Sequence, residues 1–354
     1  MRGKHSGSSS QEPVGEEARV FSFLVKRLVS GFVIVVLVSL AVFTLFFYGP
    51  KSPALELCRR DTHNRCGPTS PKLAEYEERL GYNNPMLSEY GKWAKGLAVG
   101  RTITIGATSY DCGAPCMGVS YRDRTMVSSQ LKDKFPITLS LAIGASVLYL
   151  LIGVTTGVLA ARRRGTTADK MLVSSTLVFS SVPYYLVALL SMLYLTITTD
   201  IFPRVEYHSF LHNPLKWATG LLLVWLVLGI YGSTAYTRYA RGSMVESLSE
   251  DYVRTARAKG LSNNAVVVKH ALRSALVPVA TIFGLDLAFL LSGTVFTEKI
   301  FDLEGIGKWG LDAIQIKDLP VVQATSLVLA VLVVAANIMV DILYSVLDPR
   351  VRLS

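Results

Sequence analysis

The sequence lacks a phosphate-binding loop, a zinc-site pattern and any recognisable catalytic constellation. Its nearest approach to a phosphate-binding loop is Gly307-Lys308, but Trp309 stands where Ser or Thr is required and Asp302 where a Gly is required. The histidines outside the amino-terminal tail have no partners at metal-ligand or acid–base spacing: His63, His208, His212 and His270. We therefore expect no catalytic residue, no metal site and no cofactor in this chain.

Polar composition is also low, and this excludes an ordinary soluble domain. Of 354 residues, 51% are hydrophobic, and the mean hydropathy is +0.40. The formal charge of +10 raises the possibility of a nucleic-acid partner. Many of the basic residues, however, flank long apolar runs, so the sequence favours a membrane protein that binds no nucleic acid.

Apolar runs of membrane-spanning length, about 20 residues each, organise the chain. An amino-terminal signal peptide is excluded, since the first run is long and no small-x-small cleavage site follows it. The six expected transmembrane helices cover residues 28–47, 136–161, 171–196, 217–236, 276–296 and 321–347. The fold class is therefore all-α and polytopic. The expected parts are a disordered cytoplasmic tail (1–20), a first transmembrane helix (21–48), a long loop (49–135), a five-helix core (136–348) and a short tail (349–354).

Basic residues predict the orientation of these spans. They concentrate at Lys26-Arg27, at 162–170, in the central loop and near the carboxyl end, all on one side of a six-span topology. Short loops rich in Lys and Arg stay in the cytoplasm, whereas long loops are largely exempt from this rule. We expect a multi-pass protein of the bacterial plasma membrane with both termini in the cytoplasm and loop 49–135 outside.

All the cysteines lie in that outer loop: Cys58, Cys66, Cys112 and Cys116. An even number on the exported side indicates disulfides in an oxidising compartment. Three pairings are possible, and the short separations favour Cys58 with Cys66 and Cys112 with Cys116. Metal binding with His63 is the alternative, but the CxxC pairs of a structural zinc site are absent.

The most informative stretch is the polar segment 247–273, SLSEDYVRTARAKGLSNNAVVVKHALR. Ser247 with Glu250 fits a capping box that opens a helix, Gly260 suits its left-handed end, and Ser262 can cap a second helix. One interpretation is a basic amphipathic loop that rests on anionic lipid. The other is a small, partly apolar surface that enters a groove on another protein.

The spacing within this segment resembles the EAA loop of ABC-importer membrane subunits. That pattern is Glu-Ala-Ala, three residues, Gly, nine residues, then Ile-x-Leu-Pro; Ala256, Gly260 and Leu272 match it, while Arg254, Thr255, His270 and Arg273 depart from it. The stretch DYVRTARAKGLS is similar to the version in the oligopeptide/dipeptide/nickel permease branch. In that family the loop docks into a cleft of a cytoplasmic ATPase. The resemblance assigns coupling to Tyr252, Thr255, Ala256, Ala258, Gly260, Leu261 and Leu272.

Three further segments resemble the same family, nearest its B-type peptide permease subunits: LGYNNPMLSEYGKWAKGLAVG, VFTEKIFDLEGIGKWGLDAIQIKDLPVVQ and DILYSVLDPRVR. The resemblance implies a type I ABC importer permease fold. The Cys-bearing extracytoplasmic insert after the first helix lies outside what the resemblance explains. The resemblance also implies a non-catalytic subunit that forms half of a peptide path with a second permease subunit. Two ATPase subunits, which use ATP and Mg²⁺, and an extracytoplasmic substrate-binding protein complete the expected assembly.

Other functions remain open at this point. The permease branch also carries nickel and other small solutes. An ion-coupled secondary transporter would need carboxylates inside the membrane, and Asp286 is the one candidate near the middle of a span. Asp286 either lines the substrate path or contacts another helix. A membrane scaffold with a disulfide-bonded outer domain is the third class, and neither of the last two needs the central loop.

Overall fold

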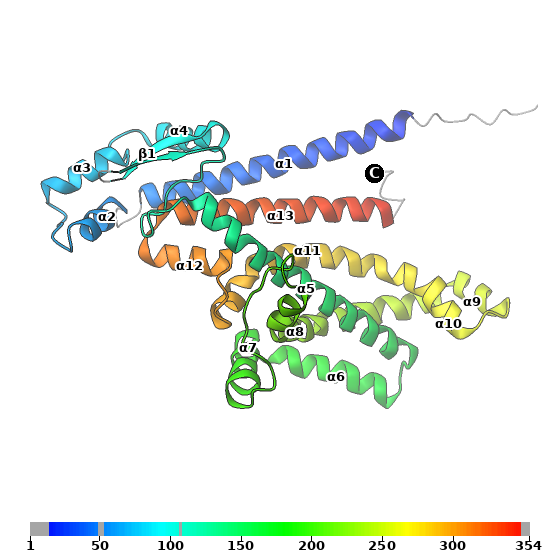
Figure 1. The fold of residues 1–354 in the computed structure, drawn as a ribbon. Helices are drawn as coiled ribbons and strands as arrows, with labels where there is room; N and C mark the ends of the chain where they lie inside the picture. The colour runs from blue at the N-terminus through cyan, green and yellow to red at the C-terminus, as the bar shows by residue number, and fades with distance from the viewer. Residues whose placement is uncertain (1–13, 49–52, 106–107, 348–354) are drawn as a thin grey trace, which may run out of the picture.

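The computed structural model describes residues 14–48, 53–105 and 108–347. The molecule is long and helical, and several of its connections lie at its two ends (Figure 1). The short helices α9 (Asp251–Ala258) and α10 (Asn263–Ala265) lie at one end together with the α5–α6 connection. The other end carries α12 (Ile306–Ile316) and the segment 49–135, which we call the insert. The expected tail 349–354 and the first 13 residues of the amino-terminal tail lie outside the described residues.

Five long helices form the body of the molecule: α1 (Val14–Phe47), α5 (Val127–Arg162), α8 (Pro214–Ser249), α11 (Leu272–Ile300) and α13 (Leu319–Leu347). In α1, α5, α8 and α13 an apolar stretch long enough to cross a bilayer lies within the helix; for α11 the stretch covers 263–284 and so begins before the helix. These stretches overlap five of the six predicted spans. The structure therefore confirms a mostly helical polytopic fold.

The sixth predicted span, 171–196, is not one straight helix. It is divided into α6 (Thr167–Ser181), α7 (Tyr184–Ser191) and a π-helix, η1 (Met192–Thr198), with a bend of 90° between the two halves. The cause is Pro183, which disfavours helical geometry in the residue before it. Val182 is accordingly extended, with φ −86° and ψ 129°. Counted as one broken span, these halves bring the total to six.

Two predicted boundaries are wrong. Helix α1 begins at Val14, inside the segment expected to be a disordered tail. Helix α5 begins at Val127, so Pro136 lies within this helix instead of opening it. In both cases an established helix extends cheaply beyond its apolar stretch, because propagation costs far less than nucleation.

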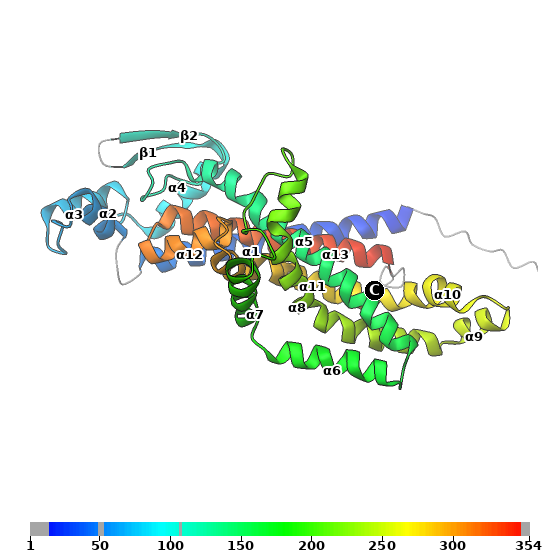
Figure 2. The ribbon, with the colours of Figure 1, turned by 60° about the horizontal axis from the view of Figure 1, so that its bottom comes forward.

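The insert is a small unit with its own core. It contains α2 (Pro53–Asp61), α3 (Pro71–Arg79), α4 (Met86–Val99) and an antiparallel hairpin of β1 (Arg101–Ile105) and β2 (Thr108–Cys112), which the sequence analysis did not predict. The register pairs Arg101 with Cys112. Figure 2 shows the hairpin lying across α4.

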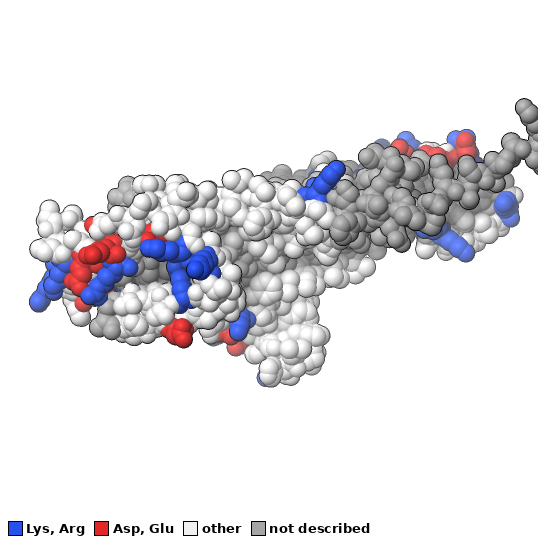
Figure 3. All heavy atoms as spheres, turned by 90° about the horizontal axis from the view of Figure 1, so that it is seen from above, with Lys and Arg blue, Asp and Glu red and all other residues white. Residues whose placement is uncertain are grey.

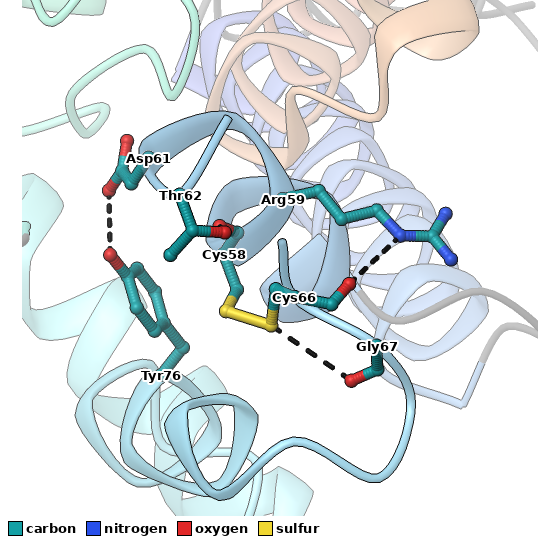
Figure 4. Close-up of a disulfide and its surroundings, with 7 residues drawn as sticks. All are labelled: Cys58, Arg59, Asp61, Thr62, Cys66, Gly67 and Tyr76. Atoms are coloured by element: carbon teal, nitrogen blue, oxygen red, sulfur yellow. Dashed lines mark hydrogen bonds between the residues drawn. A yellow bond between two sulfur atoms is a disulfide. The ribbon is translucent and has the colours of Figure 1, made fainter. Parts of the chain in front are cut away.

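Two disulfides, Cys58–Cys66 and Cys112–Cys116, hold the insert together, which confirms the favoured pairing. The Cys58–Cys66 bridge is buried between α2 and α3, and nearby Tyr76 donates a 2.9 Å hydrogen bond to Asp61 (Figure 4). Disulfides contribute most where a small unit cannot build a large apolar core. The insert is such a unit.

Close packing of α5 against α8 forms the centre of the helical body. A Cβ at Gly157 would lie 2.7 Å from the Cβ of Ala240, and one at Gly153 would meet Tyr236. The Gly153-x-x-x-Gly157 pattern thus allows the two backbones to approach. Trp225 on α8 also donates a 3.0 Å hydrogen bond to the carbonyl of Ser140 on α5. This contact ties the two helices together in the halves nearer their amino-terminal ends.

The surface between the two ends is largely apolar. On the face in Figure 3, charged side chains gather mostly at the two ends, and few lie between them. Along α1, Leu28, Phe32 and Leu45 are 58%, 69% and 71% exposed. Such a contiguous apolar surface is typical of contact with lipid or with another membrane subunit.

Candidate functional site

The central loop, 247–273, contains a sharply defined first helix. The chain leaves α8 at Glu250, which is extended at φ −66° and ψ 149°, and α9 follows from Asp251 to Ala258. Gly260 then takes φ +76°, the left-handed geometry predicted for it. The predicted capping box is wrong: Ser247 lies inside α8, and its hydroxyl contacts that of Ser274 at 3.4 Å. Helix α8 simply continues one turn further than the sequence pattern suggested.

The second half of the loop has no separate helix that ends near Leu272. Ser262 caps α10 by accepting a 3.4 Å hydrogen bond from the amide of Ala265, as predicted. The chain then passes through a π-helical segment, η2 (Val266–Ala271), directly into α11. Leu272 is therefore the first residue of a long helix. Helix α11 contains Pro278, which removes one backbone hydrogen bond about two turns after the helix begins.

One face of the loop packs against the rest of the chain. Val253 and Ala256 of α9 are buried with Val266 and Val267 of η2, and Met244 and Ala161 belong to the same cluster. Ala256 is only 7% exposed. Its small side chain is thus required by packing within this chain, and the expectation that Ala256 presents a free small surface is wrong.

The opposite face is exposed and carries the other predicted coupling residues except Leu272, which is half-buried at the start of α11. Tyr252 and Leu261 are each 43% exposed, and Thr255, Ala258 and Gly260 are exposed as well. This exposed set is called the docking face below. It combines apolar side chains with cationic neighbours, of which Arg254 contacts only Asp251, at 3.5 Å, among the described residues. Either an apolar groove with an acidic rim or an anionic lipid surface would complement it.

A buried ion pair braces this end of the molecule, and the sequence analysis did not find it. Arg241 of α8 donates two hydrogen bonds, of 2.6 and 2.8 Å, to the two carboxylate oxygens of Asp169. Asp169 is 3% exposed and also accepts a 2.9 Å bond from the amide of Gly165. A guanidinium and a carboxylate joined by two parallel hydrogen bonds are fixed both in their separation and in their relative orientation. The Thr166-x-x-Asp169 capping pattern was the available signal, since Thr166 caps α6.

Asp286 lies in α11 beside α8. The hydroxyl of Tyr236 donates a 2.7 Å hydrogen bond to Asp286 Oδ2. Tyr236 is 2% exposed, and its ring lies 4.9 Å from that of Tyr149 on α5. The described contacts therefore place the carboxylate in a contact between helices.

The turn between α11 and α12 is organised around Glu298, which is fully buried. Its Oε1 accepts a 2.7 Å hydrogen bond from Thr138 of α5, and its Oε2 accepts a 2.8 Å bond from the amide of Lys308. Thr138 Oγ1 in turn accepts a 2.9 Å bond from the amide of Ile306. Burial raises the pKa of Glu298, opposed by these hydrogen bonds. This carboxylate belongs to the Glu-x-x-Phe part of the family-like loop, but its role as an organiser was not predicted.

A second carboxylate fastens the insert to the helical body. Asp318, just before α13, accepts bonds from the Ser120 hydroxyl at 2.5 Å and from the amides of Tyr121 and Arg122 at 3.0 and 3.1 Å. It is 2% exposed. A carboxylate with three donors and little solvent makes a strong, directional contact. No sequence pattern distinguished Asp318 from an ordinary cap.

The described residues contain no group of three or more His, Cys, Asp or Glu side chains placed to hold a metal ion. His208 lies 3.7 Å from Glu206, without a further ligand of this kind.

Comparison with known proteins identifies the family. Residues 153–353 match the family described as "Binding-protein-dependent transport system inner membrane component", and residues 20–142 match its amino-terminal companion. This chain belongs to that family. It is an ABC-importer permease and a multi-pass membrane protein.

Relatives match the permease over almost its whole length. A putative peptide transport system permease protein of Brucella abortus is 34% identical over 332 residues, which cover 94% of this chain and 99% of that protein. The dipeptide transport system permease protein of Escherichia coli strain K12 is 31% identical over 361 residues, with coverages of 94% and 99%. A chain of the inward-facing MetNI methionine ABC transporter is 17% identical and covers 62% of the permease and 97% of its own length, with a TM-score of 0.48.

Proposed function

We propose that this permease subunit serves an ATP-driven peptide importer. The printed names of its relatives, peptide and dipeptide transport permeases, support peptide as the substrate class. In this proposal the chain forms half of the translocation path, and a second permease subunit forms the other half. An external binding protein delivers the peptide.

The docking face is the observation that carries the coupling part of the proposal. Tyr252 and Leu261 remain exposed although neighbouring Val253 and Ala256 are buried. An exposed apolar pair on a well-packed base suits insertion into a groove of another protein. We assign that groove to a cytoplasmic ATPase, which binds ATP and Mg²⁺, while this chain hydrolyses nothing.

Coupling then follows from the continuity of the loop with α11. If the ATPase groove moves between two nucleotide states, α9 moves with η2, because Val253 and Ala256 pack against Val266 and Val267. The displacement then reaches the first turns of α11, which continue η2 up to Pro278. Differential docking in the two ATPase states biases two helix arrangements. The proposal places the docking face and both termini in the cytoplasm and the insert outside.

Reconstitution of the complete transporter in proteoliposomes tests the proposal. With binding protein and labelled dipeptide outside and ATP at the ATPase face, we expect uptake that requires hydrolysis. Leu261→Asp should abolish this uptake, because a carboxylate replaces an apolar contact. Uptake that continues without ATP and follows an ion gradient would instead assign the chain to ion-coupled transport.

A further inference from the structure

Helix α4 of the insert packs against α1 near the end of its membrane-spanning stretch. That stretch, Val25–Leu45, has 21 residues. At 1.5 Å per residue it is about 31 Å long, which matches the hydrocarbon core of a bilayer, about 30 Å thick. Leu45 therefore marks the edge of this core on the insert's side of the membrane.

Side chains of α4 contact α1 within this stretch. The Tyr90 hydroxyl lies 2.8 Å from that of Ser39, and the sulfur of Met86 accepts a 3.9 Å hydrogen bond from Thr44. At 1.5 Å per residue, Ser39 lies about 9 Å from Leu45 along the axis of α1. These contacts hold the first half of α4 at the level where the hydrocarbon core meets the headgroups.

Helix α4 has three faces, and two of them are exposed. The first face includes the buried residues Trp93 and Gly96 and packs on the protein. The second face is apolar, and the third carries two lysines. Residues three or four positions apart share one face of a helix, so the apolar face consists of Leu87, Gly91, Ala94 and Ala98, and the lysine face of Ser88, Lys92, Lys95 and Val99.

Together the two outer faces form an amphipathic surface. Leu87 is 69% exposed, and Ala98 is exposed on the same face. Lys92 pairs with Glu89 at 2.6 Å, yet its side chain remains 60% exposed, and Lys95 is exposed as well. An apolar face beside a cationic face suits the boundary between lipid hydrocarbon and phosphate.

From this arrangement we propose that the two exposed faces of α4 bind phospholipid in the leaflet on the insert's side of the membrane. Amphipathic interfacial helices bury their apolar face about 5–10 Å into the boundary between headgroups and acyl chains, which agrees with the depth of the Tyr90 contact. In this position the apolar face contacts acyl chains. Lys92 and Lys95 extend their ammonium groups to the lipid phosphates.

A second permease subunit is the other candidate for this surface. Lysine is depleted at protein interfaces, whereas Lys92 and Lys95 both lie on the exposed part of α4. The apolar face also offers no aromatic side chain of the kind that anchors such interfaces. Both features favour lipid as the occupant.

Site-directed spin labelling of the permease in its complete complex, reconstituted in phospholipid vesicles, tests the proposal. All four native cysteines are in disulfides, so one added cysteine directs the nitroxide label. Leu87→Cys and Ala98→Cys report on the apolar face, and the neighbouring Ser88→Cys reports on the lysine face. Ala74→Cys is the matched control, because Ala74 is exposed on α3, which lies beyond the end of α1 in Figure 1.

The readout is the ratio of two collision rates of the label. One is with molecular oxygen, which concentrates in hydrocarbon, and the other is with a water-soluble nickel chelate. We expect the ratio of oxygen to nickel collisions to be higher at Leu87 and Ala98 than at Ser88, and to be lowest at Ala74.

Two other outcomes would overturn the proposal. A ratio at Leu87 and Ala98 as low as that at Ala74 would mean that water covers the apolar face. Rare collisions with both reagents at Leu87 and Ala98 would mean that protein covers it. If Leu87→Cys does not assemble, Ala98→Cys decides the question for the same face. Transport is not part of the readout, so the result is independent of the proposed function.

Discussion

Replacement of Gly260 by valine is the sharpest test of the docking face. Gly260 adopts φ +76°, and a Cβ built there would meet no heavy atom within 4 Å. The substitution therefore creates no clash, and its cost is confined to the backbone conformation. Left-handed geometry costs a non-glycine residue about 1–2 kcal/mol. A β-branched residue such as valine rarely adopts this geometry at all.

That cost converts directly into an expected loss of coupling. If valine shifts the loop away from its native turn, only the molecules that still have this turn can dock. The apparent affinity for the ATPase then decreases in proportion to the fraction of molecules with the native turn. A cost of one to two kcal/mol corresponds to a factor of about 5–30. We expect the amount of co-purified ATPase to decrease by a factor in this range. The stimulation of ATP hydrolysis by loaded binding protein should decrease by a similar factor.

Gly165 offers a matched control at the same end of the molecule. It has φ +82° and also meets no heavy atom within 4 Å of a built Cβ, but it lies in the α5–α6 connection. Gly165→Val therefore carries the same backbone cost outside the docking face and should keep normal coupling. Normal coupling in Gly260→Val, or equal losses in both variants, would refute the docking role. A loop that only rests on lipid predicts ATPase association in both.

Three further predictions concern polar groups elsewhere. Asp286→Asn retains an oxygen that can accept the 2.7 Å hydrogen bond from Tyr236, so assembly should be normal. Uptake of cationic or free-amine peptides should decrease. Unchanged uptake would mean that the carboxylate serves only in its contact between helices. Asp318→Ala removes the acceptor of the buried Ser120 hydroxyl and of two partly buried amides of the insert. It should lower the stability of the insert's attachment by about 1–3 kcal/mol, seen as faster proteolysis within 49–135; native protease resistance would argue against this attachment. Mass spectrometry of non-reduced native protein should find all four cysteines in disulfides, and alkylation of all four would contradict an oxidising location.

The comparison of prediction with structure shows where local patterns suffice. Apolar run length located the spans, because crossing a bilayer requires a minimum number of apolar residues whatever the neighbours are. The short separations within Cys58–Cys66 and Cys112–Cys116 favoured the correct pairing. The positive φ of Gly260 and the cap at Ser262 were also predictable. The turn and the cap were predictable because each depends only on the backbone of a few neighbouring residues.

The tertiary structure decided which side chains face inward and which distant groups meet. Ala256 belonged to the same small-residue pattern as Ala258, yet only packing against Met244 and Val266 determined that it is buried. Glu298 meets Thr138, and Asp318 meets Ser120, across separations of 160 and 198 residues. Such contacts depend on how the helices and the insert pack against one another. The spacing of residues within a short segment does not determine that packing.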